Sequence, residues 1–308
     1  MIRLSFWPPV VLLMLGTFIG AQAAGPVKSD LTGASNTSLL YVGLFNGQTV
    51  NVYRVPQNEG PIQQILDGVS NITGDLAVDK SQRLYATSNA VMVYPRGGLV
   101  PALRYNFADQ HQPPLVAGTA IGSDGTLYTA MYGDGLVAAY LRGTQQRASL
   151  TIPTPSGTTA WAVAVDAQDN VYIEYAAAPY PSTGHIEKCA PGSTQCTDLG
   201  ITLNAAGNHL AVDLQGNLIA CDQLAAKIEI FPPGSNQPRV ISQGLVGCPN
   251  FALNASEDLL YVANQPHDGN NHGVSIFDYA SGALVGSITA GIPSDDLIIG
   301  VALSPVAH

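Results

Sequence analysis

The chain repeats at an interval of about 44 residues, and this repeat limits its fold more than any other feature. One strand-ending position recurs at steps of 44, 43, 44, 47 and 42 residues, as Tyr41, Tyr85, Tyr128, Tyr172, Ile219 and Tyr261. Periods of ~40 to 50 residues are typical of propeller blades. Helical repeats of similar length would need amphipathic helices, and the sequence lacks their periodicity. The repeat therefore predicts a ring of β-sheets.

Each repeat contains the pattern of four antiparallel strands. In LAVDLQGNLIACD (210–222) two apolar strands flank a polar turn, as in a β-hairpin. A third strand ends in an aromatic residue before a Pro/Gly turn, as in KIEIFPPGS (227–235), and a fourth strand leads to the next repeat. Four such strands make one blade. We therefore predict an all-β fold, a six-bladed β-propeller with four antiparallel strands per blade.

The two ends of the chain supply complementary parts of one blade. The repeats begin at a second strand, SLLYVGLF (38–45), and end with a first strand, LIIGVALSP (297–305). Pairing of the C-terminal strand with the N-terminal hairpin would complete the sixth blade and remove open sheet edges, which favour aggregation. We expect the propeller to occupy residues 38–308.

The N-terminus has the pattern of an export signal. Arg3 supplies a positive charge, residues 10–19 an apolar run, and Ala21 to Ala23 a small-x-small cleavage site. We predict a signal peptide over 1–23, a linker over 24–37, and a secreted or periplasmic protein. The apolar run is short for a bilayer span. We therefore expect no membrane association after cleavage, with an uncleaved membrane anchor as the alternative.

The charge balance narrows the class of partner. The formal net charge is −10, so the basic surface that phosphate binding demands is missing. We therefore expect neither nucleic acid nor an anionic membrane as a partner. We expect the partner to be a small polar molecule, a glycan or another protein. We also expect the protein to be a monomer.

Four cysteines in an exported chain are more typical of disulfides than of metal ligands or nucleophiles. Cys189 and Cys196 flank a connection between a third and a fourth strand, so they face each other across a hairpin. Cys221 ends a second strand, and Cys248 begins the first strand of the next repeat. Strand directions place Cys221 and Cys248 at the same rim, near the central channel, so a disulfide between them is plausible, as is one between Cys189 and Cys196. The sequence alone leaves the connectivity open.

Candidate functional residues gather at one rim of the predicted channel, where first strands begin and second strands end. Amide and aromatic side chains there suit a small polar or sugar-like ligand, although turns commonly contain the same residue types. The candidate ligand-binding residues are Asp75, Asn89, Tyr132, Trp161, Tyr175, Asn208, His209, Asp222, Asn250 and Asn264.

The repeats resemble those of NHL-type six-bladed propellers, most clearly in LAVDLQGNLIACDQLAAKIEIFPPGS (210–235). The resemblance extends over about residues 38 to 305 and implies the architecture. It implies little about activity, because the shared residues are turn and core residues. Asp79, Asp166 and Asp213 are examples, since a carboxylate at the end of an inner strand can accept hydrogen bonds from turn amides.

A distant resemblance to the gluconolactonase and senescence-marker propellers implies a metal-dependent alternative. Those proteins hold a divalent metal over the channel with a Glu, an Asn and an Asp at the starts of inner strands. Asn250, after Pro249, is similar to their Asn-bearing motif, but no early Glu is present. Calcium takes six to eight oxygen ligands. We therefore predict no cofactor, and the alternative is a divalent metal such as calcium held by Asp75, Asn208, His209 and Asn250.

Two classes of function remain open from the sequence. The first is an exported binding module that uses the polar rim of the channel. The second is a channel-metal-dependent hydrolase of the lactonase kind, or a lyase. The sequence assigns no catalytic residue. His185 and Glu187 lie two apart on one strand face, and a solvated pair explains that spacing equally well.

Overall fold

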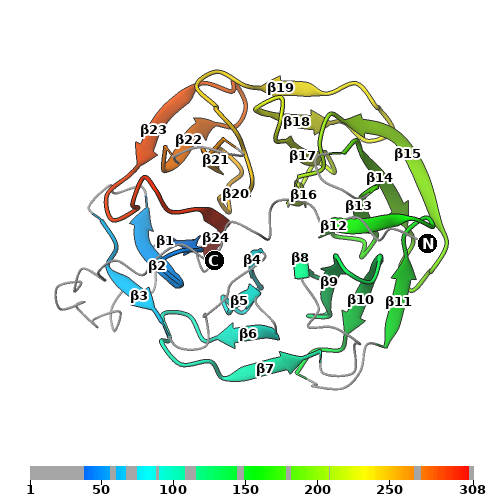
Figure 1. Cartoon of the computed structure of the whole chain (residues 1–308), viewed down its shortest axis with the longest axis horizontal. Coiled ribbons are helices and arrows are strands. Elements are labelled where there is room, and N and C mark those ends of the chain that lie inside the picture. Colours follow the sequence, from blue (N-terminus) through cyan, green and yellow to red (C-terminus); the bar gives the residue numbers. More distant parts are fainter. Residues whose placement is uncertain are drawn as a thin grey trace, which may run out of the picture.

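The computed structural model describes residues 38–55, 60–66, 75–87, 90–107, 116–143, 149–177, 182–207, 209–266 and 272–304. The predicted signal peptide and linker lie outside these residues. The described part of the chain forms 24 strands in six four-stranded sheets, arranged around a central axis (Figure 1). It contains no helix that is long and apolar enough to cross a membrane. The predicted six-bladed propeller is confirmed.

Each blade runs from an inner strand beside the channel to an outer strand at the periphery. Blade 1 consists of β24 (Ile298–Ser304), β1 (Ser38–Leu44), β2 (Thr49–Val55) and β3 (Gln63–Ile65). Blade 2 consists of β4 (Leu76–Val78), β5 (Leu84–Thr87), β6 (Ala90–Tyr94) and β7 (Leu103–Asn106). Blade 3 consists of β8 (Val116–Ile121), β9 (Leu127–Met131), β10 (Leu136–Tyr140) and β11 (Leu150–Pro153). Blade 4 consists of β12 (Thr158–Val165), β13 (Val171–Ala177), β14 (Gly184–Cys189) and β15 (Cys196–Leu203). Blade 5 consists of β16 (Leu210–Val212), β17 (Leu218–Asp222), β18 (Lys227–Phe231) and β19 (Arg239–Ile241). Blade 6 consists of β20 (Phe251–Leu253), β21 (Leu259–Ala263), β22 (Val274–Asp278) and β23 (Leu284–Ile288).

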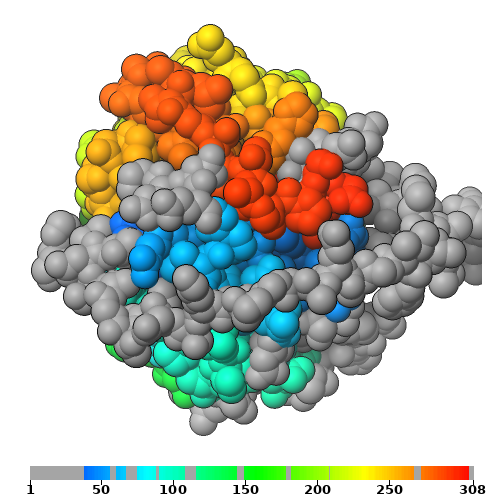
Figure 2. Space-filling view, turned by 90° about the vertical axis from the view of Figure 1, so that its left-hand side faces the viewer, coloured from blue at the N-terminus to red at the C-terminus, as the bar shows by residue number. Residues whose placement is uncertain are grey.

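The two ends of the described chain close the ring. Strand β24 pairs antiparallel with β1, so that Leu303 lies opposite Leu40 and Gly300 opposite Gly43. In Figure 2 the red C-terminal strand region lies against the blue N-terminal blade. The closure expected from the orphan first strand is therefore confirmed.

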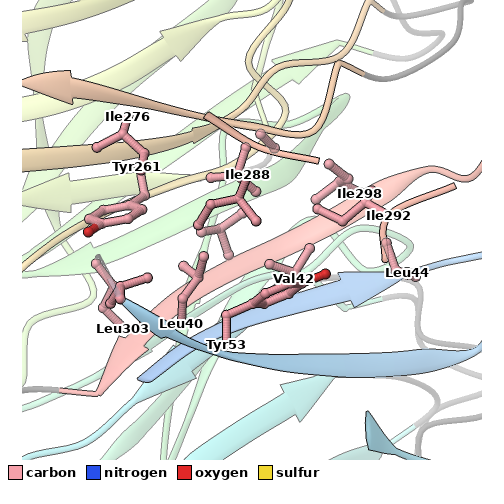
Figure 3. Close-up of a cluster of buried hydrophobic side chains, with 14 residues drawn as sticks. Leu40, Val42, Leu44, Tyr53, Tyr261, Ile276, Ile288, Ile292, Ile298 and Leu303 are labelled. Atoms are coloured by element: carbon pink, nitrogen blue, oxygen red, sulfur yellow. The ribbon is translucent and has the colours of Figure 1, made fainter. Parts of the chain in front are cut away.

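The hydrophobic core lies between neighbouring blades. One buried cluster joins blade 1 to blade 6, and Figure 3 shows Leu40 and Leu303 of blade 1 facing Tyr261 of blade 6. Tyr261 is one of the six repeat positions, and all six side chains are at most 8% exposed. Burial of a large apolar side chain stabilises a fold by about 1.5–3 kcal/mol. The repeat position therefore supplies one anchor of the core in every blade.

Both predicted disulfides are present. Cys189 and Cys196 are cross-strand partners on β14 and β15. The Cys221–Cys248 bond joins blade 5 to the segment that leads into blade 6. Two disulfides are typical of an oxidising environment, extracellular or periplasmic.

The turns that follow the inner strands have a structural role. Asp213 accepts hydrogen bonds from the backbone N–H groups of Gln215 and Asn217, at 3.0 and 2.7 Å. Some of these turns also carry a non-glycine residue at positive φ, which is rare because the side chain crowds the backbone. Three of these positive-φ residues accept a hydrogen bond from the preceding blade: Asp169 from Ser123, Glu257 from Leu214 and Gln82 from Ser304. At the end of the channel where the inner strands end, the side chains therefore stabilise the contacts between neighbouring blades.

Gly300 of inner strand β24 and its cross-strand partner Gly43 of β1 test how closely blade 1 packs on blade 2. A Cβ on Gly300 would lie 2.6 Å from Leu76 Cγ and 2.9 Å from Leu76 N, whereas a Cβ on its partner Gly43 has no neighbour closer than 3.5 Å. We expect Gly300→Ala to lower the free energy of unfolding by about 1–3 kcal/mol. Gly43→Ala should change it by less than about 1 kcal/mol. Urea denaturation measures both, and equal effects would contradict the packing described.

Candidate functional site

Asp75 lies just before inner strand β4, at the rim where the sequence places the candidate residues, and its side chain is buried. Its Oδ1 accepts hydrogen bonds from Leu76 N and Asn250 Nδ2, both at 2.7 Å. Its Oδ2 accepts from Thr119 N at 3.2 Å and pairs with His209 Nδ1 at 2.8 Å. A carboxylate has about four lone-pair positions. All four are therefore engaged.

The Asp75–His209 bond crosses the channel. Asp75 belongs to blade 2 and His209 to blade 5, and these blades are opposite each other in a ring of six (Figure 1). Asn250 extends the network, because its Oδ1 accepts a hydrogen bond from Val301 N of blade 1 at 2.9 Å. We call Asp75, Thr119, His209 and Asn250 the rim network. With Val301 it connects five of the six blades.

The rim network sets the orientation of the His209 imidazole. A carboxylate can only accept, so in the neutral form of the ring Nδ1 carries the proton and Nε2 is left as an acceptor. Nε2 has no hydrogen-bond partner in the part of the chain that the structure describes. The ring packs edge-to-face on Phe251 with its centroid 4.8 Å away, and its side chain is 12% exposed. His209 therefore presents an oriented acceptor beside the channel.

The channel forms a cavity of about 340 Å³. Each inner strand is hydrogen-bonded to its blade on one side only. Its other backbone edge needs a side chain, as for Thr119 N and Val301 N, or water or a ligand as partner. The side chains along the wall are mostly small, and they include Ala77, Ala120, Ala164, Ala211, Ala252 and Ala302. Small-molecule sites have volumes of about 300–1,000 Å³. The channel therefore suits a small ligand with several hydrogen-bonding groups.

Trp161 and Tyr132 form an aromatic pair at the same rim. The ladder between β12 and β13 skips Trp161, between Ala160 and Ala162, and such a bulge re-aims a side chain. The Trp161 and Tyr132 rings meet edge-to-face with centroids 4.8 Å apart, and both residues are half-buried. Tyr132 follows β9 of blade 3, and Trp161 lies on blade 4, which is next to blade 5 with His209. Neither ring is part of the cavity lining, so the pair lies at the rim outside the cavity.

Glu174 supports the segment that leads to His209. Its side chain is fully buried, and its Oε1 accepts a hydrogen bond from Gly207 N at 2.7 Å. Its Oε2 has no partner among the residues that the structure describes. Burial raises the pKa of Glu174 well above 4.5, the Gly207 bond opposes this, and the charge of Asp222 adds to it.

Sequence reasoning missed both Glu174 and Thr119. Glu174 lies two residues after the repeat position Tyr172, and it is the only charged residue at that offset, where the other repeats have Gly43, Thr87, Ala130, Cys221 and Ala263. This contrast between repeats could have identified it. Thr119 enters the network through its backbone N–H, which no side-chain pattern indicates.

Other predicted rim residues hold local structure. Asp222 accepts hydrogen bonds from the backbone N and side-chain Nδ2 of Asn204, at 2.9 and 2.7 Å. Asn264 accepts from Val246 N and donates to Gly244 O, both at 2.8 Å. Tyr175 is buried and stacks on His185. Asn89 and Asn208 lie outside the described residues.

The oxygen atoms of Asp75 and Asn250 do not form a binding site for a calcium ion. Both carboxylate oxygens already accept two hydrogen bonds each, and Asn250 Oδ1 accepts one from Val301 N. Calcium needs six to eight oxygen ligands, with carboxylates among them. A cation here would have to displace the bonds that join the blades. That the chain has no cofactor stays a prediction.

Comparisons with known proteins support the fold and leave the activity open. No protein-family model matches the chain, and no curated protein matches its sequence. A crystal structure of a protein of unknown function from Bacteroides caccae has a similar fold, with a TM-score of 0.63 and 12% sequence identity. The likeness covers 87% of this chain and 99% of that one.

Asp75→Asn tests the rim network. An amide at position 75 would turn an NH₂ group toward donors that now bind a carboxylate, and removing one partner of a buried pair costs about 3–5 kcal/mol. We expect Asp75→Asn to lower the free energy of unfolding in urea by about 3 kcal/mol or more. The control is Asp134→Asn, because Asp134 is exposed, and its effect should stay within about 0.5 kcal/mol. Equal effects would contradict the network.

Glu174 predicts a pH dependence of stability. Because burial raises its pKa in the folded protein, the protonated form is favoured on folding, and this contribution is lost as the pH rises from about 4.5 through the folded pKa. We expect the free energy of unfolding of Glu174→Gln to fall less than that of the natural protein between pH 5 and 8. Urea denaturation across this range measures the difference, and parallel curves would contradict the burial argument.

Proposed function

We propose that this protein is an exported binding protein that takes a small polar ligand, such as a glycan, at the rim of its central channel. The observation that carries the proposal is the imidazole of His209, which Asp75 holds across the channel with Nε2 facing no described partner. A monomeric state and the absence of nucleic-acid and membrane partners stay predictions.

His209 and the aromatic pair at the same rim suit a hydroxyl-rich ligand. Nε2 can accept a hydrogen bond from a hydroxyl group, since a hydroxyl is both donor and acceptor. The half-buried rings of Tyr132 and Trp161 offer apolar faces at the same rim. Aromatic side chains supply much contact area at binding sites. A sugar, with apolar ring faces and hydroxyl edges, matches both kinds of surface.

A lyase or hydrolase is the second candidate, and one observation favours it. A histidine whose Nδ1–H is held by a buried carboxylate is oriented to accept a proton at Nε2. The Asp75–His209 pair has this arrangement. The metal-dependent form of this candidate has no support from the oxygen atoms of Asp75 and Asn250, because they already accept hydrogen bonds.

The test is a ligand screen with defined variants. A panel of mono- and oligosaccharides is scanned by thermal shift, because a ligand at 100 times its Kd stabilises a protein by about 2.7 kcal/mol. We expect Trp161→Ala and His209→Gln each to weaken binding of any hit by about tenfold or more. Leu214→Ala changes an exposed side chain that lines the channel cavity at its other end, so it reports a ligand bound at that end. The control Leu284→Ala changes an exposed side chain on the outer strand β23, away from the channel, and should leave binding unchanged.

Two outcomes would redirect the proposal. A hit that binds more weakly to Leu214→Ala, but equally well to Trp161→Ala and His209→Gln, would contradict binding at this rim. Recovery of a hit in cleaved form, detected by mass spectrometry and abolished by His209→Gln, would establish the enzymatic candidate. If activity also requires a metal that a chelator removes, the metal-dependent form is right.

A further inference from the structure

The outer hairpin of blade 4 brings a carboxylate beside the Cys189–Cys196 disulfide. Glu187 and Cys189 lie two apart on β14 and so share one face of the strand. Cys196 on β15 is the direct cross-strand partner of Cys189. The Glu187 carboxylate oxygen and the two sulfur atoms all lie within 4.8 Å of one another. In the described residues this is the only group of three or more His, Cys, Asp or Glu side chains so close together.

Glu187 is an unusual residue for this position. It is only 8% exposed, and its Oε1 is buried without a hydrogen-bond partner among the described residues. A second carboxylate, Asp198, lies opposite it across the hairpin. A buried polar atom without a partner destabilises a fold, as does a like charge directly opposite. Packing alone therefore gives no reason for a glutamate here.

The equivalent residue of the next blade shows the contrast. Glu229 has the same place in KIEIFPPGS that Glu187 has in HIEKCAPGS. Glu229 is paired with Lys227, with 2.7 Å between Oε1 and Nζ. No such cation faces Glu187 among the described residues, and its near neighbours are the two sulfurs.

We propose that reduction of the Cys189–Cys196 disulfide converts this hairpin into a site for a thiophilic divalent cation such as zinc, with Cys189, Cys196 and Glu187 as ligands. Zinc prefers thiolate, imidazole and carboxylate ligands in a tetrahedral arrangement. Three protein ligands leave the fourth position to water. The oxidised hairpin holds no such site, because both sulfurs are bonded to each other.

The chemistry balances with a dithiol as the reductant. A thiolate of the dithiol attacks one sulfur, and the mixed disulfide is then resolved by the second thiol. The disulfide takes up two electrons and two protons and becomes two thiols, while the dithiol becomes a disulfide. The metal then displaces the two thiol protons as it binds. Cys196 is half-buried, so the reductant can approach from its side, whereas Cys189 is buried.

The experiment titrates Co²⁺, a spectroscopic substitute for zinc, into the full chain before and after reduction by a dithiol, which is removed under anaerobic conditions. We expect one equivalent to bind only after reduction, with a sulfur-to-cobalt charge-transfer band. Glu187→Gln should weaken binding by about tenfold or more, as expected for loss of a metal contact. The matched control Glu229→Gln removes the same charge in blade 5 and should bind as the natural protein does.

A second measurement assigns the site. Zn²⁺ should slow the alkylation of Cys196 in the reduced protein, as read by mass spectrometry, and should not change the rate at the buried Cys221 and Cys248. This readout uses the natural chain, so it does not depend on a cysteine variant folding. Absence of the charge-transfer band, equal binding by Glu187→Gln, or protection of the other pair would each overturn the proposal.

Discussion

The pairing of β24 with β1 is the interaction on which the rest of the structure depends. It joins the C-terminal inner strand to the N-terminal second strand and so makes one blade from the two ends of the chain. Without it the ring would keep two open sides, and the interblade cluster of Leu40, Tyr261 and Leu303 would lose its blade 1 part. Closure also places Val301 where its N–H reaches Asn250, so the rim network depends on the same pairing.

The two ends of the channel have different roles. At the ends of the inner strands, Asp213 holds a turn and residues such as Asp169 bind the preceding blade. At the starts of the inner strands, the network centred on Asp75 spans the channel itself. The first kind of contact joins neighbours around the ring, whereas the second also joins blades that are not neighbours, from Asp75 of blade 2 to His209 of blade 5 and Asn250 of blade 6. The candidate site therefore lies where side-chain hydrogen bonds cross the channel, which suits binding by a pre-organised site.

The fold could be predicted from the sequence because its determinants are local and repeated. Tyr85 and Tyr261 recur at the same place in their hairpins, and LIIGVALSP has the pattern of a strand without a partner. The site could be predicted in part. Strand direction brings Asp75, His209 and Asn250 to one rim, and the structure bonds them to one another. The mutual hydrogen bonding of these side chains and the backbone contribution of Thr119 depend on contacts between blades that are distant in sequence, so no local pattern indicates them. The buried Glu174 can be found from the sequence only by comparing the same position in all six repeats.

The central claim is that Asp75 holds His209 across the channel and that Nε2 has no partner among the described residues. Its most direct test is the tautomer of the His209 imidazole. Nitrogen-15 NMR of the imidazoles, with the His209 signals assigned by their loss in His209→Gln, distinguishes the two ring nitrogens. For the neutral form of the ring, the account predicts a proton on Nδ1 and an unprotonated Nε2 whose signal shifts when a ligand binds. A ring protonated at Nε2, or averaging between the two tautomers, would contradict it.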